Sequence, residues 1–174
     1  MPLHIAILGN SGSGKSTLAQ QLAHTHSLAS LDLDTIAFLP GQEAVPRDPA
    51  EAAALVRDFC TRHAAQGWVM EGCYATLIDH ALAFSPVLVW LDPGTDVCVA
   101  HCQARPWEPH KYPSKEAQDR NLAMLIEWVR GHDTREGELG RAAHAALFAG
   151  YAGPRIHCMR EADEALLREV ANLG

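Results

Sequence analysis

The sequence is poor in several features that would assign it to a specialised class of protein. Its 174 residues contain no apolar run close to the roughly 20 residues that a membrane-spanning helix needs. It has no internal repeat and no low-complexity tract, and its 48% hydrophobic and 20% charged residues are ordinary for a globular protein. The sequence therefore predicts one globular domain over 1–174 without a membrane partner, as a monomer or a homodimer.

Basic residues are also missing before the short apolar stretch at the N-terminus, so we expect MPLHIAIL to form a first strand and not a signal peptide. The cysteines are odd in number and lack the spacing of a secreted disulfide scaffold, which indicates reduced thiols in a cytoplasmic protein. Cys98, His101 and Cys102 share one helix face, but no second ligand pair accompanies them. Burial as small apolar side chains is favoured over a zinc site.

Lysine is scarce, and it occurs only at Lys15, Lys111 and Lys115. The formal net charge is −7, which opposes non-specific binding to nucleic acid because such binding depends on Lys and Arg neutralising phosphates. We therefore expect no nucleic-acid partner.

Segments typical of strands and helices alternate along the chain. Alternation of this kind predicts an α/β fold with a parallel sheet covered by helices on both faces. The predicted strands are 3–8, 27–34, 68–72, 86–92 and 155–159, and the predicted helices are 16–26, 49–65, 75–84, 96–104, 115–130, 139–150 and 163–173. The stretch 35–47 contains two prolines and a glycine, and it is predicted to be a long loop.

One segment, at about 105–120, interrupts this alternation. It carries three prolines, two aromatic residues and both lysines that lie outside the first loop. It is either a plain surface connection or a mobile lid, and the lid is favoured because long loops in compact domains usually serve a function.

The first loop carries the most specific motif of the sequence. Gly9, Gly14, Lys15 and Ser16 fulfil the pattern G-x-x-x-x-G-K-[ST] between a predicted strand and a predicted helix. Glycines allow successive backbone N–H groups to surround an anion, and the positive end of the following helix points at the same anion. The residues of this phosphate-binding loop are Gly9, Asn10, Ser11, Gly12, Ser13, Gly14, Lys15, Ser16 and Thr17. The loop is predicted to bind the phosphates of a nucleoside triphosphate, with Lys15 at the β- and γ-phosphates and Ser16 as a ligand of Mg²⁺.

Carboxylates stand at the ends of three predicted strands, where ligands of open α/β sheets bind. Asp32 and Asp34 end the second strand, Glu71 the third and Asp92 the fourth. A carboxylate in such a place either holds a metal-bound water or accepts the proton of an attacking hydroxyl. Their recurrence at successive strand ends favours one shared site over separate capping or solvated roles.

Together these motifs resemble the small P-loop phosphotransferases that include shikimate kinase, gluconate kinase and adenylate kinase. The resemblance is greatest to bacterial ATPases of the topology-modulation-protein-like or shikimate-kinase-like kind. The segments that carry it are GNSGSGKST, LDLDTIAFLPG, WVMEGCY and VLVWLDP, which cover about half of the chain in the expected order.

The resemblance implies a P-loop three-layer αβα fold with a five-stranded parallel sheet of order 2-3-1-4-5, a lid segment, and ATP with Mg²⁺. It implies that Asp34 contacts the acceptor hydroxyl, that Asp32 lies near the metal and that Glu71 orients Mg²⁺ through water, with Asp92 as the second choice. Lid arginines of the family neutralise the charge on the transferring phosphoryl group. The resemblance gives this role to Arg105 first, with Arg120 and Arg135 as the next candidates. The GPR segment before the fifth strand resembles the loop beside the adenine, which places Gly153 and Arg155 near the base.

The chain departs from its relatives on the acceptor side. It lacks the glycine run after the third strand and the dedicated arginine that shikimate kinase uses for the shikimate carboxylate, and the region by which adenylate kinase clamps a nucleoside monophosphate is not recognisable. The segments FLPGQEAVPR and GCYATL are expected to line the acceptor pocket, with Arg47 and Tyr74 in contact with the acceptor.

The sequence thus predicts a kinase that moves the γ-phosphoryl group of MgATP to a hydroxyl or phosphate of a small molecule. Lys15, Asp34 and Arg105 are its predicted catalytic residues, and Asp34, Arg47, Glu71, Tyr74 and Arg135 face the acceptor. The alternative is a nucleic-acid-associated or regulatory P-loop ATPase without a small-molecule acceptor.

Overall fold

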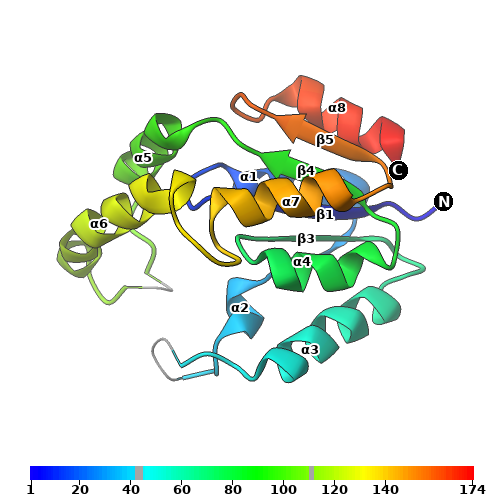
Figure 1. The fold of residues 1–174 in the computed structure, drawn as a ribbon, viewed down its shortest axis with the longest axis horizontal. Helices are drawn as coiled ribbons and strands as arrows, with labels where there is room; N and C mark the ends of the chain where they lie inside the picture. Colours follow the sequence, from blue (N-terminus) through cyan, green and yellow to red (C-terminus); the bar gives the residue numbers. More distant parts are fainter. Residues whose placement is uncertain (42–44, 110–111) are drawn as a thin grey trace.

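A computed structural model of the protein describes residues 1–41, 45–109 and 112–174. Its centre is a sheet of five parallel strands in the order β2-β3-β1-β4-β5 (Figure 1). The strands are β1 (His4–Gly9), β2 (Ala29–Asp32), β3 (Trp68–Gly72), β4 (Val87–Leu91) and β5 (Arg155–Cys158). The strand order and the α/β class predicted from the sequence are confirmed.

The three central strands are continuous apolar runs because helices cover them on both faces. Every residue of β3 and of β4 is buried, as are the last five residues of β1. Parallel pairing then brings the carboxyl ends of the strands to one edge, where Asp32 pairs with Glu71 and Gly9 pairs with Leu91. This edge is the place where the chemistry-bearing residues meet.

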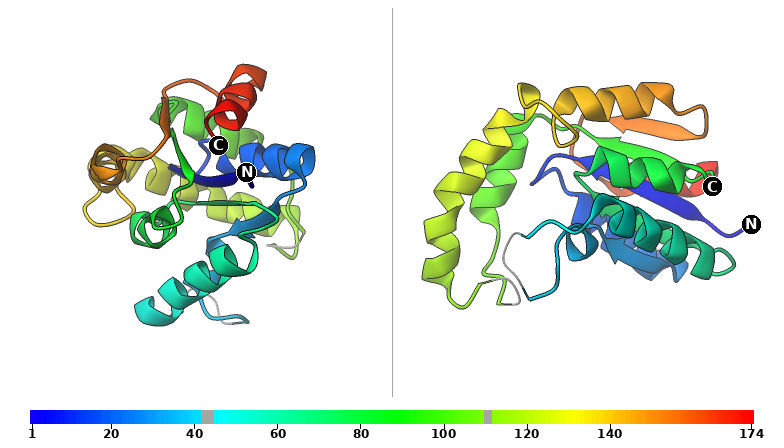
Figure 2. Two further views of the ribbon diagram at one scale, coloured as in Figure 1. Left: turned by 90° about the vertical axis from the view of Figure 1, so that its right-hand side faces the viewer. Right: turned by 60° about the horizontal axis from the view of Figure 1, so that its bottom comes forward.

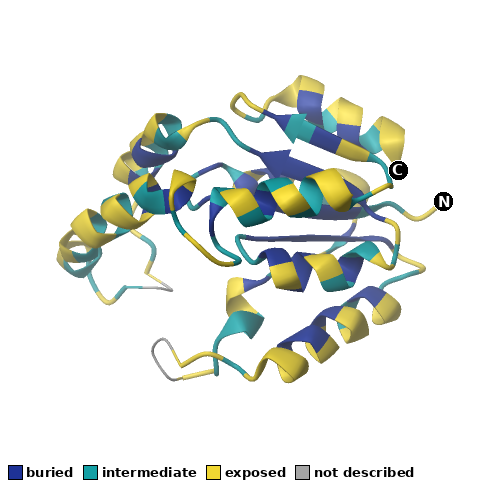
Figure 3. Cartoon of the chain, viewed as in Figure 1, coloured by how far each residue is buried: buried dark blue, intermediate teal, exposed yellow. Residues whose placement is uncertain are grey.

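Helices cover both faces of the sheet in separate apolar layers (Figures 1 and 3). On one face, α1 (Lys15–His26) and α8 (Glu164–Leu173) bury Leu18, Leu22, Leu166 and Val170 against β1 and β4. The other face is covered by α4 (Ala75–Leu82), α7 (Arg141–Gly150) and α3 (Pro49–Arg62), which packs beside α4 and against β3. Figure 3 shows the result as an alternation of buried and exposed stripes along each helix.

Two helices lie beyond the carboxyl edge of the sheet, and Figure 2 shows that they pack side by side. They are α5 (Thr95–Ala104) and α6 (Lys115–Arg130), which is followed by the 3₁₀ helix η1 (Gly131–Asp133). Cys98, Val99, Cys102 and Val129 form a small apolar cluster between them. The segment between the two helices is the first part of the proposed lid, and its residues 110–111 lie outside the described residues.

The stretch 35–47 is not wholly the loop that the sequence predicts. It overlaps a short helix, α2 (Asp34–Ala37). Asp32 fixes the first turn of this helix. The side chain of Asp32 accepts a hydrogen bond from the Asp34 backbone N–H, and the carbonyl of Asp32 accepts one from the Thr35 hydroxyl. A helix of four residues is too short for apolar periodicity to reveal it. Residues 42–44 of the predicted acceptor segment lie outside the described residues, and α3 ends at Arg62, earlier than predicted.

Among the described residues, no helix combines the length and the apolar character needed to cross a membrane.

Candidate active site

The glycine-rich loop joins the end of β1 to the start of α1, as its sequence predicts. Gly12 and Gly14 adopt φ of 78° and 95°, the left-handed region that side chains with a Cβ disfavour. At Gly14 a Cβ would meet nothing within 4 Å, so the loop is open where α1 begins. The open loop and the helix N-terminus together form a cradle for an anion.

Helix α5 packs directly against this loop. A Cβ on Gly12 would lie 2.4 Å from the carbonyl oxygen of Cys98 and 2.8 Å from Sγ of Cys102. Both cysteines are buried, and burial raises the pKa of the Cys98 thiol to about 11. His101 lies at the surface of the same helix, where its Nδ1 bonds the Gly12 carbonyl at 2.7 Å and its Nε2 lies 3.2 Å from Glu161 Oε1. These side chains hold α5 on the phosphate-binding loop.

Lys15 is buried, with only 7% of the residue exposed, and its Nζ donates a 2.7 Å hydrogen bond to the carbonyl of Asn10 within the loop. Burial by itself lowers the pKa of this amine, but Cys73, Glu71 and Asp34 together outweigh it and raise the pKa. Lys15 is therefore held as a cation at the carboxyl edge of the sheet.

Ser16 and Glu71 meet across the loop, because Ser16 Oγ donates a 2.8 Å hydrogen bond to Glu71 Oε1. Burial raises the pKa of Glu71, and the nearby charges of Asp32 and Asp34 act in the same direction while Lys15 opposes them. A hydroxyl and a carboxylate side by side next to a phosphate cradle fit Mg²⁺, which usually binds through one or two protein oxygens, phosphates and water. Within the described residues no group of three or more His, Cys, Asp or Glu side chains forms a metal cage.

Asp34 and Tyr74 form a second pair beside the first. The Tyr74 hydroxyl donates a 2.7 Å hydrogen bond to Asp34 Oδ1. Burial and the adjacent Asp34 charge raise the pKa of Tyr74, so the phenol stays protonated and remains the donor. The ring of Phe38 stands edge-on to that of Tyr74 at 6.5 Å between centroids.

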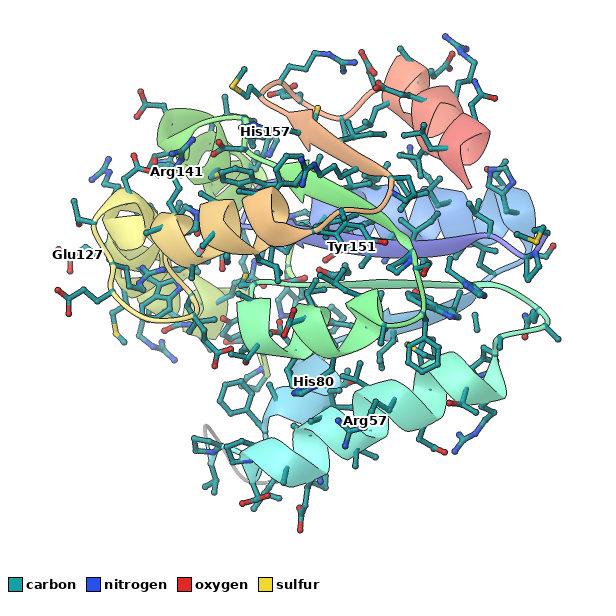
Figure 4. The ribbon with its side chains drawn as sticks, turned by 45° about the vertical axis from the view of Figure 1, so that its right-hand side comes forward. Arg57, His80, Glu127, Arg141, Tyr151 and His157 are labelled. Atoms are coloured by element: carbon teal, nitrogen blue, oxygen red, sulfur yellow. The ribbon has the colours of Figure 1, made fainter. Side chains whose placement is uncertain are left out.

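Asp92, by contrast, is engaged by other residues. Arg141 donates to it at 2.6 Å and His157 of β5 at 2.9 Å, and Figure 4 labels both basic side chains near the carboxyl end of β4. Burial by itself raises the pKa of Asp92, but these two hydrogen bonds outweigh it and lower the pKa. The structure therefore brings Ser16 to Glu71 and brings Asp92 to Arg141.

The two arginines expected at the acceptor, Arg47 and Arg135, bond to backbone carbonyls. Arg47 donates to the carbonyl of Ile36 at 2.8 Å and to that of Phe38 at 3.4 Å. Arg135 donates to the carbonyls of Trp128 and Leu139, and its guanidinium carbon lies 3.4 Å from the centroid of the Trp128 ring. Arg47 thus links to the chain at Ile36 and Phe38, and Arg135 links the end of α6 to the segment before α7.

Of the lid arginines, Arg105 stands at the C-terminal end of α5 and Arg120 on α6. Arg105 is 3.6 Å from the carboxylate of Glu108 inside the lid, and Arg120 is exposed on α6.

The assignment of Gly153 and Arg155 to the adenine is wrong. Arg155 pairs with Leu88 at the amino end of β5, whereas Cys158 at the other end pairs with Leu91 beside the loop. The guanidinium of Arg155 donates to the carbonyls of Phe148 and Ala149. The GPR segment precedes its strand, and therefore lies at the edge of the sheet opposite the one where ligands bind.

Three further contacts join the segments around the site: two involve His144 and Glu138, which no sequence motif indicates, and one involves Asn10 of the phosphate-binding loop. The buried ring of His144 donates from Nε2 to the carbonyl of Cys73 at 2.7 Å, and Asn10 Nδ2 donates to the carbonyl of Val129 at 3.0 Å. The carboxylate of Glu138 accepts from the backbone N–H and the hydroxyl of Thr76 at the start of α4. The residues in each of these contacts are far apart in the sequence, so no local sequence pattern predicts the contacts.

Comparisons with known proteins place this geometry in context. No protein-family model matches the chain. Its sequence is 30% identical, over 145 residues, to the shikimate kinase of Rhodopirellula baltica, an alignment that covers 75% of this chain and 74% of that protein.

Solved structures of similar fold include three kinases. A sugar kinase from Janibacter sp. HTCC2649 aligns with a TM-score of 0.59 at 15% identity, covering 99% of this chain and 94% of that one. A gluconokinase from Sinorhizobium meliloti 1021 aligns with a TM-score of 0.52 at 19% identity, covering 99% of this chain and 91% of that one. A shikimate kinase from Bacteroides thetaiotaomicron aligns with a TM-score of 0.53 at 16% identity, covering 98% of this chain and 96% of that one. At these identities the likeness shows the fold.

Proposed function

Because this chain belongs to the family of small P-loop kinases that contains shikimate kinase, we propose that it transfers the γ-phosphoryl group of MgATP to a hydroxyl of a small molecule. The observation that carries the proposal is the proximity of two pairs, Ser16–Glu71 at the phosphate cradle and Asp34–Tyr74 beside it. The first pair suits the donor and the second suits the acceptor.

The donor half consists of the loop from Gly9 to Thr17. Its backbone N–H groups and the N-terminus of α1 hold the phosphates, and Lys15 turns from the Asn10 carbonyl to the β- and γ-phosphates. Ser16 and Glu71, with Asp32 beside them, would hold Mg²⁺ and its water. The metal ion, when bound, neutralises charge on the phosphates. Arg105 is the lid residue proposed to reach the transferring group, with Arg120 behind it.

The acceptor half is built around Asp34. Its Oδ2 accepts the proton of the acceptor hydroxyl while Tyr74 holds Oδ1, so the carboxylate is oriented before the reaction. The acceptor oxygen forms a bond to the γ-phosphorus, the bond to the β,γ-bridging oxygen breaks, and ADP leaves with that oxygen. Most of the catalysis is positioning and neutralisation of charge, since phosphoryl transfer needs little covalent help from the protein.

The proposal is tested by transfer of radiolabelled γ-phosphate from ATP to a mixture of hydroxyl acceptors, with Mg²⁺ present. Lys15→Ala is expected to abolish both ATP binding in calorimetry and transfer. Arg168→Ala serves as the control, because that exposed guanidinium pairs with Glu164 at 3.8 Å on the surface of α8. Hydrolysis of ATP that is stimulated by duplex DNA and by none of the acceptors would favour the regulatory ATPase and overturn the kinase.

A further inference from the structure

His144 is a fully buried polar residue in the first turn of α7. It is 0% exposed, and its Nε2 lies 2.7 Å from the carbonyl oxygen of Cys73. A carbonyl oxygen only accepts hydrogen bonds, so Nε2 carries the proton and donates it. Burial lowers the pKa of the ring to about 4, which keeps the imidazole neutral at pH 7. His144 is therefore a neutral donor aimed at one backbone carbonyl.

Packing alone does not account for a histidine at this position. Its second nitrogen, Nδ1, is buried and has no hydrogen-bond partner among residues 1–41, 45–109 and 112–174. A buried polar atom without a partner costs free energy, and an apolar side chain of similar size would avoid that cost. The hydrogen bond to the Cys73 carbonyl is the contribution that an apolar side chain could not make.

The carbonyl that His144 holds belongs to the turn between β3 and α4. Cys73 and Tyr74 form this turn, and the side chain of Tyr74 reaches Asp34. The Cys73 carbonyl and the Tyr74 backbone nitrogen share one planar peptide group. Fixing the direction of this carbonyl therefore restricts the backbone rotation that sets where the Tyr74 side chain points.

The peptide group on the other side of Tyr74 is also fixed. The Tyr74 carbonyl accepts from the Ile78 N–H at 3.0 Å, and the Ala75 N–H donates to the Glu138 carbonyl at 3.4 Å. With both flanking peptide groups held, the bond from Cα to Cβ of Tyr74 has one direction. The Ile78 bond belongs to the first turn of α4, whereas the bond to Cys73 comes from a side chain of another helix.

Helix α7 is itself anchored where it carries His144. Arg141, three residues earlier, donates to Asp92 at 2.6 Å beyond the end of β4. The ring of His132 packs on that of His144 with centroids 4.9 Å apart. These contacts restrict the position of the imidazole, so it can fix the turn that it contacts.

Resting on the phosphotransferase function above, we propose that His144 is a positioning residue for the transfer step. Its hydrogen bond to Cys73 sets the direction of Tyr74, and Tyr74 in turn orients the carboxylate of Asp34 towards the acceptor hydroxyl. A general base that is displaced by a fraction of an ångström or tilted loses much of its effect, because proton transfer depends on alignment. His144 acts through Tyr74 and touches no reacting atom.

The test removes the hydrogen bond and then restores it. His144→Leu keeps a side chain of similar size without a donor, and it is expected to lower kcat about 10–100-fold through misalignment of the base. The dissociation constant for ATP, measured by calorimetry, should stay unchanged, because the phosphate-binding loop is intact. His144→Gln places an amide nitrogen as many bonds from the backbone as Nε2, and it should recover most of the lost kcat. A loss of kcat that is equal in both folded variants would overturn the role of the hydrogen bond.

A double-mutant cycle tests whether the effect passes through Tyr74. Tyr74→Phe removes the hydroxyl that holds Asp34, so His144→Leu should lower kcat little further in that background. Losses that multiply in the double variant would show that His144 acts by another route, and would overturn the inference.

Val170→Ala controls for lost stability. Val170 is 0% exposed on α8, which covers the opposite face of the sheet from α7, and its truncation should destabilise the fold without changing kcat. A loss of kcat in Val170→Ala as large as that in His144→Leu would assign the effect to stability and overturn the inference. Wild-type transfer that is insensitive to His144→Leu overturns this inference alone. A wild-type protein that phosphorylates none of the hydroxyl acceptors overturns the proposed function, and this inference with it.

Discussion

The Tyr74 hydroxyl donates a 2.7 Å hydrogen bond to Asp34 Oδ1 across 40 residues of sequence. The bond joins the segment after β2 to the segment after β3, two neighbouring strands that end at the same edge of the sheet. It fixes one oxygen of the carboxylate and leaves the other for a substrate. In the proposed mechanism, this hydrogen bond orients Asp34 as the general base.

Replacement of this base should separate transfer from nucleotide binding. We expect Asp34→Asn to lower kcat by about 10²–10⁴-fold, the range for loss of a general base. The affinity for ATP, measured by calorimetry, should stay unchanged because Lys15 and the glycine loop are intact. Asp79→Asn, at an exposed position on α4, is the control. Transfer at the wild-type rate in Asp34→Asn would remove Asp34 from the mechanism.

The metal dependence should distinguish Glu71 from Asp92. Glu71→Gln is expected to raise the Mg²⁺ concentration for half-maximal activity by about 10–100-fold, the usual effect of losing a partner that orients a metal. Asp92→Asn should leave that concentration unchanged, because Asp92 is bound to Arg141 and His157. A larger shift in Asp92→Asn than in Glu71→Gln would reverse the two assignments.

The contact between the phosphate-binding loop and α5 should appear in stability. Gly137→Ala introduces a Cβ at a φ of 84° into open space, and should cost about 1 kcal/mol of unfolding free energy from backbone strain alone. Gly12→Ala adds a clash with the Cys98 carbonyl, and overpacking of this kind costs about 1–3 kcal/mol more. Urea unfolding followed by circular dichroism measures both. Equal losses of unfolding free energy in the two variants would mean that α5 is not packed tightly against the phosphate-binding loop.

The buried His144 should make stability depend on pH. Burial lowers its pKa from 6.5 to about 4 in the folded protein, so the unfolded chain binds a proton in this window and the folded one does not. Stability is therefore lost as pH falls from about 6.5 towards 4, by on the order of 3 kcal/mol.

The variant His144→Asn should flatten this part of the pH profile of urea unfolding, because Asn has no proton to take up in the window. His24→Asn, at an exposed position on α1, should retain the slope. An identical slope in the two variants would assign the pH dependence to other groups.

Much of the donor half was predictable because it is local. One continuous stretch contains the strand, the glycines, Lys15 and the helix that follows. The residue types of the motif determine the backbone geometry that it requires. The apolar runs of β3 and β4 were equally clear, since strands buried on both faces tolerate few polar residues. The short helix α2 was missed because four residues carry no period, and Gly153 and Arg155 were misplaced because direction along a strand decides which edge a residue reaches.

The sequence by itself determined the order of the elements and the phosphate-binding loop, because both depend on contacts between near neighbours in the chain. Only the tertiary structure decided which carboxylate has which partner: Glu71 meets Ser16, Asp34 meets Tyr74 and Asp92 meets Arg141. Three acids at successive strand ends look alike in sequence. They differ in the folded protein because burial and the partner across the gap set the charge and the direction of each carboxylate.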